Sequence, residues 1–369
     1  MIFVATSGKM CAVSIDQRSM GHLSQWSMEH LVKFSLTLPG LYGKVIDISG
    51  GPGHTVFVTE AGIVYVCGWM EFTDVNIFGM YNWALAQIPV SLPDGTHRRV
   101  KCSSGGYLHT ILLTEDGDIF AYGHGGYGEL GLGETKTAFC PTLITIQDQD
   151  GNAEKIKSVS CGRFHSVFLT TRGQVYVCGD GQCGQLGTGN TENVSIPVSI
   201  YVNSPIFEKD DFSSEYVKSV SCGAYHTVFL TISERVYVCG DGSYGQLGLP
   251  ASKREVNDIV LRPTLLEICA SNKSALSEKI KGIFCGDCHT IFLTVSGKVY
   301  GCGEAWSGKL GIDPEVMGVM KWDDESHPIC IDIRQKKFHV DDKDSPKDTQ
   351  RKRIMDISCG SYQSVFLCR

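Results

Sequence analysis

The stretch CGRFHSVFLTTRGQVYVCG at residues 161–179 decides the fold of this chain. Its HSVFLT portion is rich in β-branched and aromatic residues, which is the composition of a buried strand. The TRG that follows carries the glycine of a tight turn, and VYVCG then resumes as a second strand. The stretch is therefore predicted to form a β-hairpin.

The same pattern occurs four more times along the chain. The copies align without gaps and read GGPGHTVFVTEAGIVYVCG at 50–68, GGYLHTILLTEDGDIFAYG at 105–123, CGAYHTVFLTISERVYVCG at 222–240 and CGDCHTIFLTVSGKVYGCG at 285–303. Their shared histidines are separated by 55, 56, 61 and 63 residues, and they are His54, His109, His165, His226 and His289. A near-constant period of this kind is typical of a repeat architecture.

Each repeat contains more than the hairpin. A strand is predicted before it, as in IKSVSC at 156–161, and another after the glycine-rich stretch, as in IPVSI at 196–200. Four short antiparallel strands in about sixty residues is the content of one propeller blade. The fold class is therefore all-β, and the expected architecture is a closed β-propeller.

The two chain ends carry further part-repeats. IFVATSGKMCAVS at 2–14 aligns with 167–179, and ISCGSYQSVFL at 357–367 aligns with 159–169. We expect these N- and C-terminal half-repeats to pair, which would close the ring and remove its exposed sheet edges. This predicts six four-stranded blades in a single domain, 1–369, with seven as the alternative. The expected blades are approximately 15–70, 71–123, 124–179, 180–240, 241–303, and a composite of 304–369 with 1–14.

Composition narrows the classes of protein that this chain can belong to. Glycine makes up 42 of the 369 residues, which suits many tight turns between short strands. A net charge of -7 argues against a general nucleic-acid or anionic-membrane surface. No apolar run reaches the roughly 18 residues of a membrane span, and the start MIFVATSGKM lacks the pattern of a signal peptide.

The repeat resembles the regulator-of-chromosome-condensation family. The matching core is SCG-x-x-HT-x-x-LT-x-x-G-x-VY-x-x-G, followed by a glycine-rich signature seen as GYGELGLG at 126–133, GQCGQLGTG at 181–189, GSYGQLGL at 242–249 and, weakened, WSGKLGI at 306–312. The resemblance covers nearly the whole chain. It implies a propeller of six or seven blades, usually seven, which different members use as a guanine-nucleotide exchange factor or as a protein-binding scaffold.

The recurring glycines and histidines are interpreted as architecture. Three G-x-G-x-x-G matches begin at Gly123, Gly179 and Gly240, but each leads into another strand and not into the helix that a dinucleotide site needs. The repeat histidines fall one to a blade, whereas metal ligands must converge on one point. We expect His54, His109, His165, His226 and His289 to be buried and bonded to neighbouring backbone. No catalytic residue, cofactor or metal is predicted.

The cysteines follow the repeat as well. Nine of the sixteen fall at two repeat positions: Cys102, Cys161, Cys222, Cys285 and Cys359 at one, and Cys67, Cys178, Cys239 and Cys302 at the other. Residues at one position belong to different blades, so they are not natural disulfide partners. This pattern favours a reducing compartment, and we expect a cytoplasmic protein, with nuclear or cytoskeletal and ciliary locations as alternatives.

Two segments interrupt the repeat and are candidates for partner binding. After the first hairpin, the glycine-rich signature is replaced by an aromatic segment, 69–87. Aromatics and Met are favoured in binding hot spots. The candidate partner-binding residues are Trp69, Met70, Phe72, Phe78, Tyr81 and Trp83; the alternative is that they only cap a degenerate blade. The second segment is the polar insertion at 312–353.

These observations favour a non-catalytic scaffold that binds a protein partner, with no nucleic acid and no membrane insertion. The alternative is a guanine-nucleotide exchange factor for a Ran-like small GTPase. In that branch of the family, an Asp directly before the repeat histidine of one blade is important. The equivalent positions here are Gly53, Leu108, Phe164, Tyr225, Cys288 and Tyr362, and none is acidic.

Overall fold

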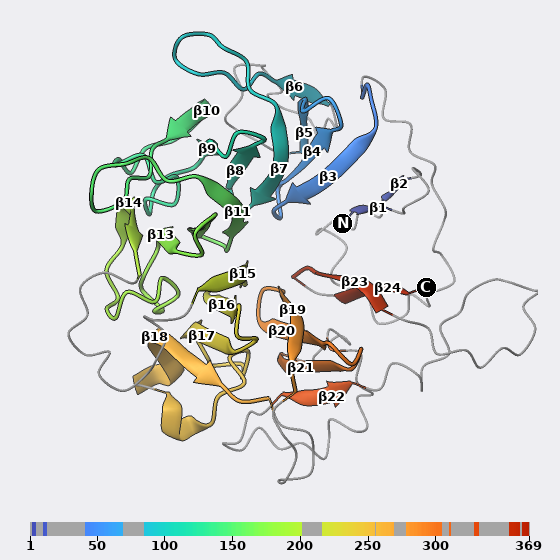
Figure 1. Cartoon of the computed structure of the whole chain (residues 1–369), viewed down its shortest axis with the longest axis vertical. Coiled ribbons are helices and arrows are strands. Elements are labelled where there is room, and N and C mark those ends of the chain that lie inside the picture. Colours follow the sequence, from blue (N-terminus) through green and yellow to red (C-terminus); the bar gives the residue numbers. More distant parts are fainter. Residues whose placement is uncertain are drawn as a thin grey trace, which may run out of the picture.

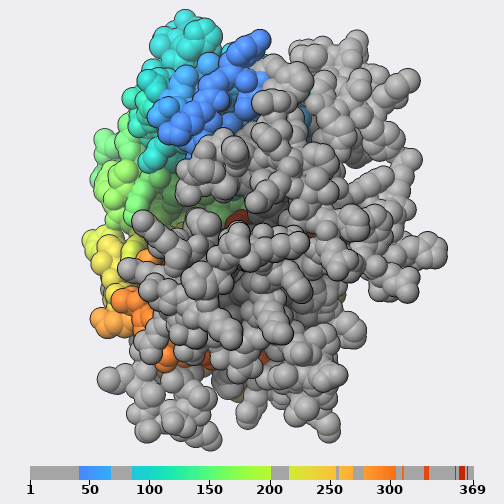
Figure 2. All heavy atoms as spheres, turned by 90° about the vertical axis from the view of Figure 1, so that its right-hand side faces the viewer, coloured from blue at the N-terminus to red at the C-terminus, as the bar shows by residue number. Residues whose placement is uncertain are grey.

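The computed structural model describes residues 2–4, 10–12, 41–68, 85–200, 216–254, 256–268, 278–304, 310, 328–331, 354–361 and 364–368. Within these ranges the chain forms five four-stranded antiparallel sheets. The sheets are arranged around a common centre in a propeller-like fold (Figure 1). Viewed from the right-hand side of Figure 1, they follow one another in chain order from blue to orange (Figure 2).

Each sheet is built from four strands in sequence order. The first contains β3 (Val45–Gly50), β4 (His54–Thr59), β5 (Val64–Gly68) and β6 (Ala86–Ile88). The second contains β7 (Val100–Gly105), β8 (His109–Thr114), β9 (Ile119–Gly123) and β10 (Ala138–Ile144). The third contains β11 (Ile156–Cys161), β12 (His165–Thr170), β13 (Val175–Gly179) and β14 (Val194–Ser199).

The last two sheets repeat this plan. The fourth contains β15 (Val217–Cys222), β16 (His226–Thr231), β17 (Val236–Asp241) and β18 (Ile259–Leu266), with the short 3-10 turns η5 (Ala251–Lys253) and η6 (Val256–Asp258) before β18. The fifth contains β19 (Ile280–Cys285), β20 (His289–Thr294), β21 (Val299–Gly303) and β22 (Ile329–Ile331). The first strand of each sheet lies towards the centre and the fourth lies outside (Figure 1).

The expected blade boundaries need correction. Boundaries at residues 70, 123, 179, 240 and 303 would separate the third strand from the strand after the glycine-rich segment. That fourth strand instead pairs with the third, as Val177 with Val198 and Val238 with Thr264. The glycine-rich segment acts as the connection that returns the chain antiparallel to the edge of the third strand. The sheets therefore span 45–88, 100–144, 156–199, 217–266 and 280–331.

Two separate hairpins come from the chain ends. β23 (Ile354–Cys359) pairs with β24 (Ser364–Cys368), and Ile357 lies opposite Phe366 as Val159 lies opposite Phe168. These are the first and second strands of the repeat. β1 (Ile2–Val4) pairs with β2 (Met10–Ala12) in the register of the second and third strands.

The composite blade expected from the sequence is therefore corrected. Both hairpins contain a second strand of the repeat, β1 and β24, so they are not complementary halves of one sheet. They form two distinct two-stranded sheets. Closure of the ring and the number of blades remain predictions.

The second strand of each sheet forms the core. Every residue of β12 is buried, because its sheet is covered on both faces. Alternate side chains of β12 point to opposite faces of the sheet. Phe168 packs with Ile111 of the preceding sheet, whereas Val167 packs with residues such as Val228 of the following one. This is why the strand reads as an almost unbroken apolar run.

The repeat histidines link each sheet to the next. Each Nε2 lies at hydrogen-bond distance from a hydroxyl on the second strand of the following sheet: His54–Thr110 at 2.8 Å, His109–Ser166, His165–Thr227 and His226–Thr290 at 3.0 Å, and His289–Ser364 at 2.8 Å. Burial of these histidines is as expected, but the expected backbone partner is wrong. The hydroxyl of the neighbouring sheet takes that place.

The direction of these bonds follows from a second contact. The Thr227 hydroxyl donates to the carbonyl of Gln185 at 2.7 Å, so it must accept from the Nε2–H of His165. Ser166 and Thr290 make the same bonds to the carbonyls of Glu129 and Gln246. One hydroxyl thus joins a histidine and a glycine-rich segment of the preceding sheet.

The neutral imidazole is enclosed on its other side by glycine. A Cβ placed on Gly162 would lie 2.4 Å from Nδ1 of His165 and 2.5 Å from the carbonyl oxygen of Gly223 in the next sheet. Only a hydrogen atom fits there, so burial is complete. Burial lowers the pKa of His54 to about 4 and the pKa of His109, His165 and His226 to about 3.

These depressed pKa values predict acid sensitivity. Below pH 6.5 the unfolded chain binds protons that the folded chain does not bind until about pH 3 to 4, so stability falls as pH falls through that window. Each buried histidine contributes a loss of up to about 1.4 kcal/mol per pH unit. Denaturant unfolding of wild type from pH 8 to pH 5 measures the slope of the unfolding free energy against pH. His165→Gln should have a shallower slope, because it lacks the contribution of one buried histidine.

His97→Gln is the matched control, because His97 is exposed in a loop. It should keep the wild-type slope. An unchanged slope in His165→Gln would contradict the neutral, buried state of that imidazole.

Candidate functional site

The predicted partner-binding residues Trp69, Met70, Phe72, Phe78, Tyr81 and Trp83 lie outside the described residues. The same holds for most of the insertion at 312–353. Their role remains a prediction. Among the described residues, the exposed surfaces that could form a site are the two faces of the sheets.

Two faces are distinguished by the turns that they carry. Face A carries the turns between the first and second strands, such as 162–164, and the glycine-rich segments after the third strands. Face B carries the turns between the second and third strands, such as 171–174. This division follows from the antiparallel order of each sheet.

A cluster of aromatic rings around one arginine lies on face A. Its members are half-buried, come from three consecutive sheets, and are Tyr107, Tyr127, Arg163, Phe164 and Tyr225. We call this cluster the face A patch. Four of the five occupy the one or two positions directly before a repeat histidine, and Tyr127 belongs to a glycine-rich segment.

Phe164 lies at the middle of the face A patch. Its ring centroid is 4.9 Å from that of Tyr127, 5.5 Å from that of Tyr107 in an edge-on arrangement, and 6.4 Å from that of Tyr225. The Arg163 guanidinium carbon lies 4.5 Å from the Tyr107 ring centroid and 5.8 Å from that of Tyr225. These are the distances of aromatic pairing and cation–π attraction.

The backbone beneath the face A patch is fixed by neighbouring sheets. The Tyr107 N–H donates to the Arg163 carbonyl at 3.0 Å, and the Arg163 N–H donates to the Ala224 carbonyl at 3.1 Å. The turn that presents Arg163 is thus held from both sides. A patch held in this way loses little conformational entropy when it binds.

The charge of Arg163 is unbalanced within the described part of the chain. No carboxylate among those residues lies within ion-pair distance of its guanidinium, and its buried Nε has no hydrogen-bond partner there. Its stabilisation comes from the surrounding rings. The face A patch therefore offers a positive group set in an aromatic surface.

Sequence reasoning missed this site although a signal was present. The positions directly before the repeat histidine vary between copies while the flanking residues stay constant, as in YLHT, RFHS and AYHT. Variation at a fixed surface position of a repeat was the available signal.

The glycine-rich segments are confirmed as turns between strands. In the second sheet, the N–H of Gly128 donates to the carbonyl of Gly125, and the N–H of Gly131 donates to that of Gly128. These N–H groups are used internally and do not point at a phosphate. Among the described residues no group of three or more His, Cys, Asp or Glu could hold a metal ion.

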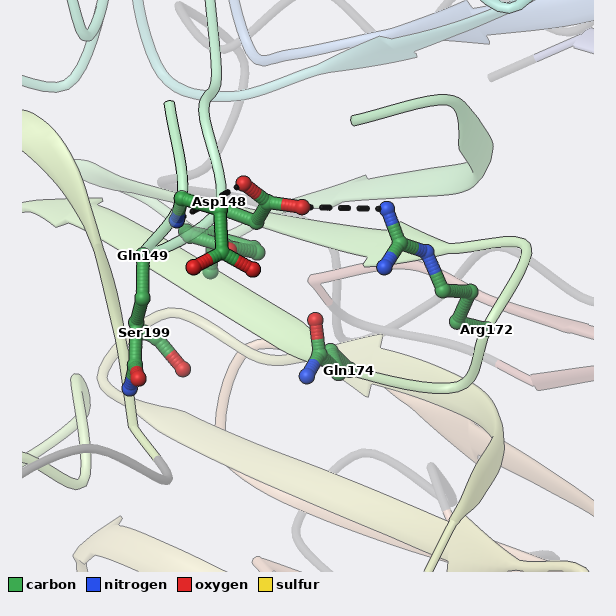
Figure 3. Close-up of a pocket in the computed structure, with 7 residues that line it drawn as sticks. Asp148, Gln149, Arg172, Gln174 and Ser199 are labelled. Atoms are coloured by element: carbon green, nitrogen blue, oxygen red, sulfur yellow. Dashed lines mark hydrogen bonds and ion pairs between the residues drawn. The ribbon is translucent and has the colours of Figure 1, made fainter. Parts of the chain in front are cut away.

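A polar pocket on face B lies between the loop at 148–150, which follows β10, and residues of the third sheet, among them Arg172, Gln174 and Ser199 (Figure 3). Arg172 at its edge bonds to Asp148 at 3.3 Å and lies 3.4 Å from the buried carboxylate of Glu154. Its positive charge is therefore already balanced by two acids. The pocket offers less to a ligand than the face A patch does.

Comparisons with known proteins identify the family. The chain is 27% identical over 283 residues to the ultraviolet-B receptor UVR8 of Arabidopsis thaliana, covering 76% of this chain and 58% of that protein. It is 29% identical to the human X-linked retinitis pigmentosa GTPase regulator, covering 77% of this chain and 31% of the regulator. The chain thus spans less than two thirds of the length of either relative.

Solved structures agree on the fold. Prp20p from Saccharomyces cerevisiae matches with a TM-score of 0.65 at 20% identity, covering 88% of this chain and 70% of that one. No helix among the described residues has the length and apolar character to cross a membrane. The model of the RCC1-like domain matches residues 16–369. The chain belongs to the RCC1-like domain family.

Proposed function

We propose that this chain is a non-catalytic scaffold that binds a protein partner through face A. The observation that carries the proposal is the face A patch, an arginine set among four aromatic rings. Tyr, Phe and Arg are the residue types enriched at the centres of protein interfaces. The fixed backbone beneath them supports recognition without rearrangement.

The chemistry of the face A patch indicates what it would recognise. The rings offer apolar area with a phenol hydroxyl on each tyrosine. Arg163 offers a planar cation without a carboxylate partner in the described part of the chain. We propose a partner segment that places an acidic side chain beside an apolar one.

The face A proposal predicts selective loss of partners on mutation. Tagged full-length Arg163→Gln and Phe164→Ala should each recover the specific partners of wild type at least about tenfold less well, because hot-spot residues contribute about 2 kcal/mol or more. Quantitative mass spectrometry of affinity-purified complexes measures this. Circular dichroism checks that both variants are folded.

Arg172→Gln is the matched control, since it removes a half-exposed arginine from face B. It should retain the partners. Equal recovery by all the variants would rule out the face A patch.

The aromatic segment around Trp69 is a second proposed contact. It is motivated by the seven aromatic and Met residues that the segment 69–87 carries where the repeat signature is missing. The Trp69→Ala/Trp83→Ala double variant should recover fewer partners in the same purification while keeping the wild-type unfolding midpoint. Unchanged partners together with lowered stability would support the alternative role as a cap on a blade.

Exchange of guanine nucleotide is the second candidate function. The support for this candidate is similarity to known proteins. The human relative is named a GTPase regulator, and Prp20p was described with its binding to Gsp1p. Against it, the residues before the described repeat histidines are Gly53, Leu108, Phe164, Tyr225 and Cys288, which are not acidic. We expect that micromolar concentrations of this chain will not accelerate the release of fluorescent GDP from a panel of Ran-like GTPases, compared with the GTPases alone. Stimulated release would reverse this ranking.

Two finer points of architecture and location belong to the same proposal. We propose seven blade positions, five for the complete sheets and one for each terminal hairpin, because β1 and β24 occupy the same place in the repeat.

We propose a cytoplasmic location, with nuclear or cytoskeletal and ciliary sites as alternatives. Its support is a buried core that holds free thiols such as Cys178, whose pKa is raised by burial.

A further inference from the structure

Lysines from four consecutive sheets line part of the centre of face B. The second residue of the first strand is lysine in four consecutive sheets, and these residues are Lys101, Lys157, Lys218 and Lys281. All four are exposed, whereas the residue before each of them is buried. The first strands lie nearest the centre of the fold (Figure 1). We call these four residues the lysine ring.

The members of the lysine ring lie close enough to act together. The Lys157 ammonium donates to the backbone carbonyl of Lys218 in the next sheet at 3.1 Å. The gap between neighbouring first strands at this level is thus within the reach of one lysine side chain. A ligand at the centre can be contacted from several sheets at once.

A second set of basic residues lies two positions earlier in the chain and is neutralised. Each of its members pairs with a carboxylate of face B: Lys44–Glu60 at 3.6 Å, Arg99–Glu115 at 3.3 Å, Lys155–Asp118 at 2.9 Å and Lys279–Glu234 at 2.9 Å. We call these pairs the rim. The rim carries no net charge as a set.

The lysine ring has no such partners. Among the described residues, no carboxylate lies within ion-pair distance of Lys101, Lys157, Lys218 or Lys281. The one carboxylate in the first strands of the five sheets, Asp47, is engaged by the N–H and hydroxyl of Ser103, each at 2.8 Å. Four positive charges therefore remain together in a chain whose net charge is -7.

Such an arrangement repels itself and attracts anions. Like charges held close together raise the local potential, and a bound anion lowers it. Lysine ammonium groups are compact charges with rotatable donors, which suits phosphate oxygens. One lysine at the same strand position in each of four consecutive sheets suits a ligand with several anionic groups around a small core.

The rim argues against extended anionic partners. A membrane surface or a nucleic-acid backbone that reached the lysine ring would also cover the carboxylates of Glu60, Glu115, Asp118 and Glu234, which are already paired in the rim. A small molecule can reach the centre without touching them. We propose that the lysine ring on face B binds a compact polyphosphate, independently of any protein bound to face A.

The test uses full-length protein and myo-inositol hexakisphosphate as the probe, measured by calorimetry at about 0.1 M salt. We expect wild type to bind it with an affinity that falls steeply with added salt. The Lys157→Gln/Lys218→Gln variant should bind at least about tenfold more weakly, because two charge-assisted contacts are lost. Thermal unfolding without the probe checks that this variant is folded.

Lys155→Gln/Lys279→Gln is the matched control, since it removes two lysines of the rim from the same face. It should bind the probe within about twofold of wild type. Three results would overturn the proposal: no binding by wild type, equal binding by the ring variant, or an equal loss in the rim variant. Ring-dependent retention of phosphoinositide vesicles or duplex DNA at comparable strength would also overturn it, since it would assign face B to an extended surface.

Discussion

The buried bridge between neighbouring sheets is the interaction on which the rest of the structure depends. In it, a hydroxyl of one sheet accepts a hydrogen bond from the histidine of the preceding sheet and donates one to a carbonyl of that sheet's glycine-rich segment. The thiol of Cys239 donates to the same Gln185 carbonyl at 3.6 Å. The repeat histidine, the repeat cysteine and the glycine-rich segment thus meet at one point. A charged imidazole could not take part, because its enclosed Nδ1 faces a glycine Cα and has no acceptor.

The bridge explains why the sheets keep a constant relation to one another although their connections differ in length. The intervals between repeat histidines grow from 55 to 63 residues, but the histidine–hydroxyl distance stays between 2.8 and 3.0 Å. Extra residues are accommodated outside the bridge, beyond the third strand. Because each bridge uses groups from two sheets, no sheet is satisfied alone, and order is expected to spread from neighbour to neighbour.

The repeat made the sheets predictable, because a strand buried on both faces tolerates few residue types. The pattern HSVFLT is enough to place β12, its register with β13, and the burial of His165. The predictions that were wrong concern contacts between sheets. The hydrogen-bond partner of His165 is 62 residues away, and nothing in the sequence near the turn indicates Thr227. The composite blade failed because alignments of the two ends overlap at the second strand. The face A patch was missed because its members are adjacent only after three sheets come together.

The two faces differ in a way that bears on what each can recognise. On face A the positions beside the repeat histidine vary, so three sheets contribute Tyr107, Arg163 with Phe164, and Tyr225 to a surface without internal symmetry. An unsymmetrical surface suits a protein partner, because it can distinguish one orientation from another. On face B four sheets contribute the same residue at the same place. A surface with the same residue at the same place in each sheet cannot distinguish one orientation of a partner from another. It therefore suits a small ligand that carries several equivalent charged groups. On these two proposals, one repeat supplies a specific protein-binding face and a general anion-binding face, depending on which of its positions varies between copies.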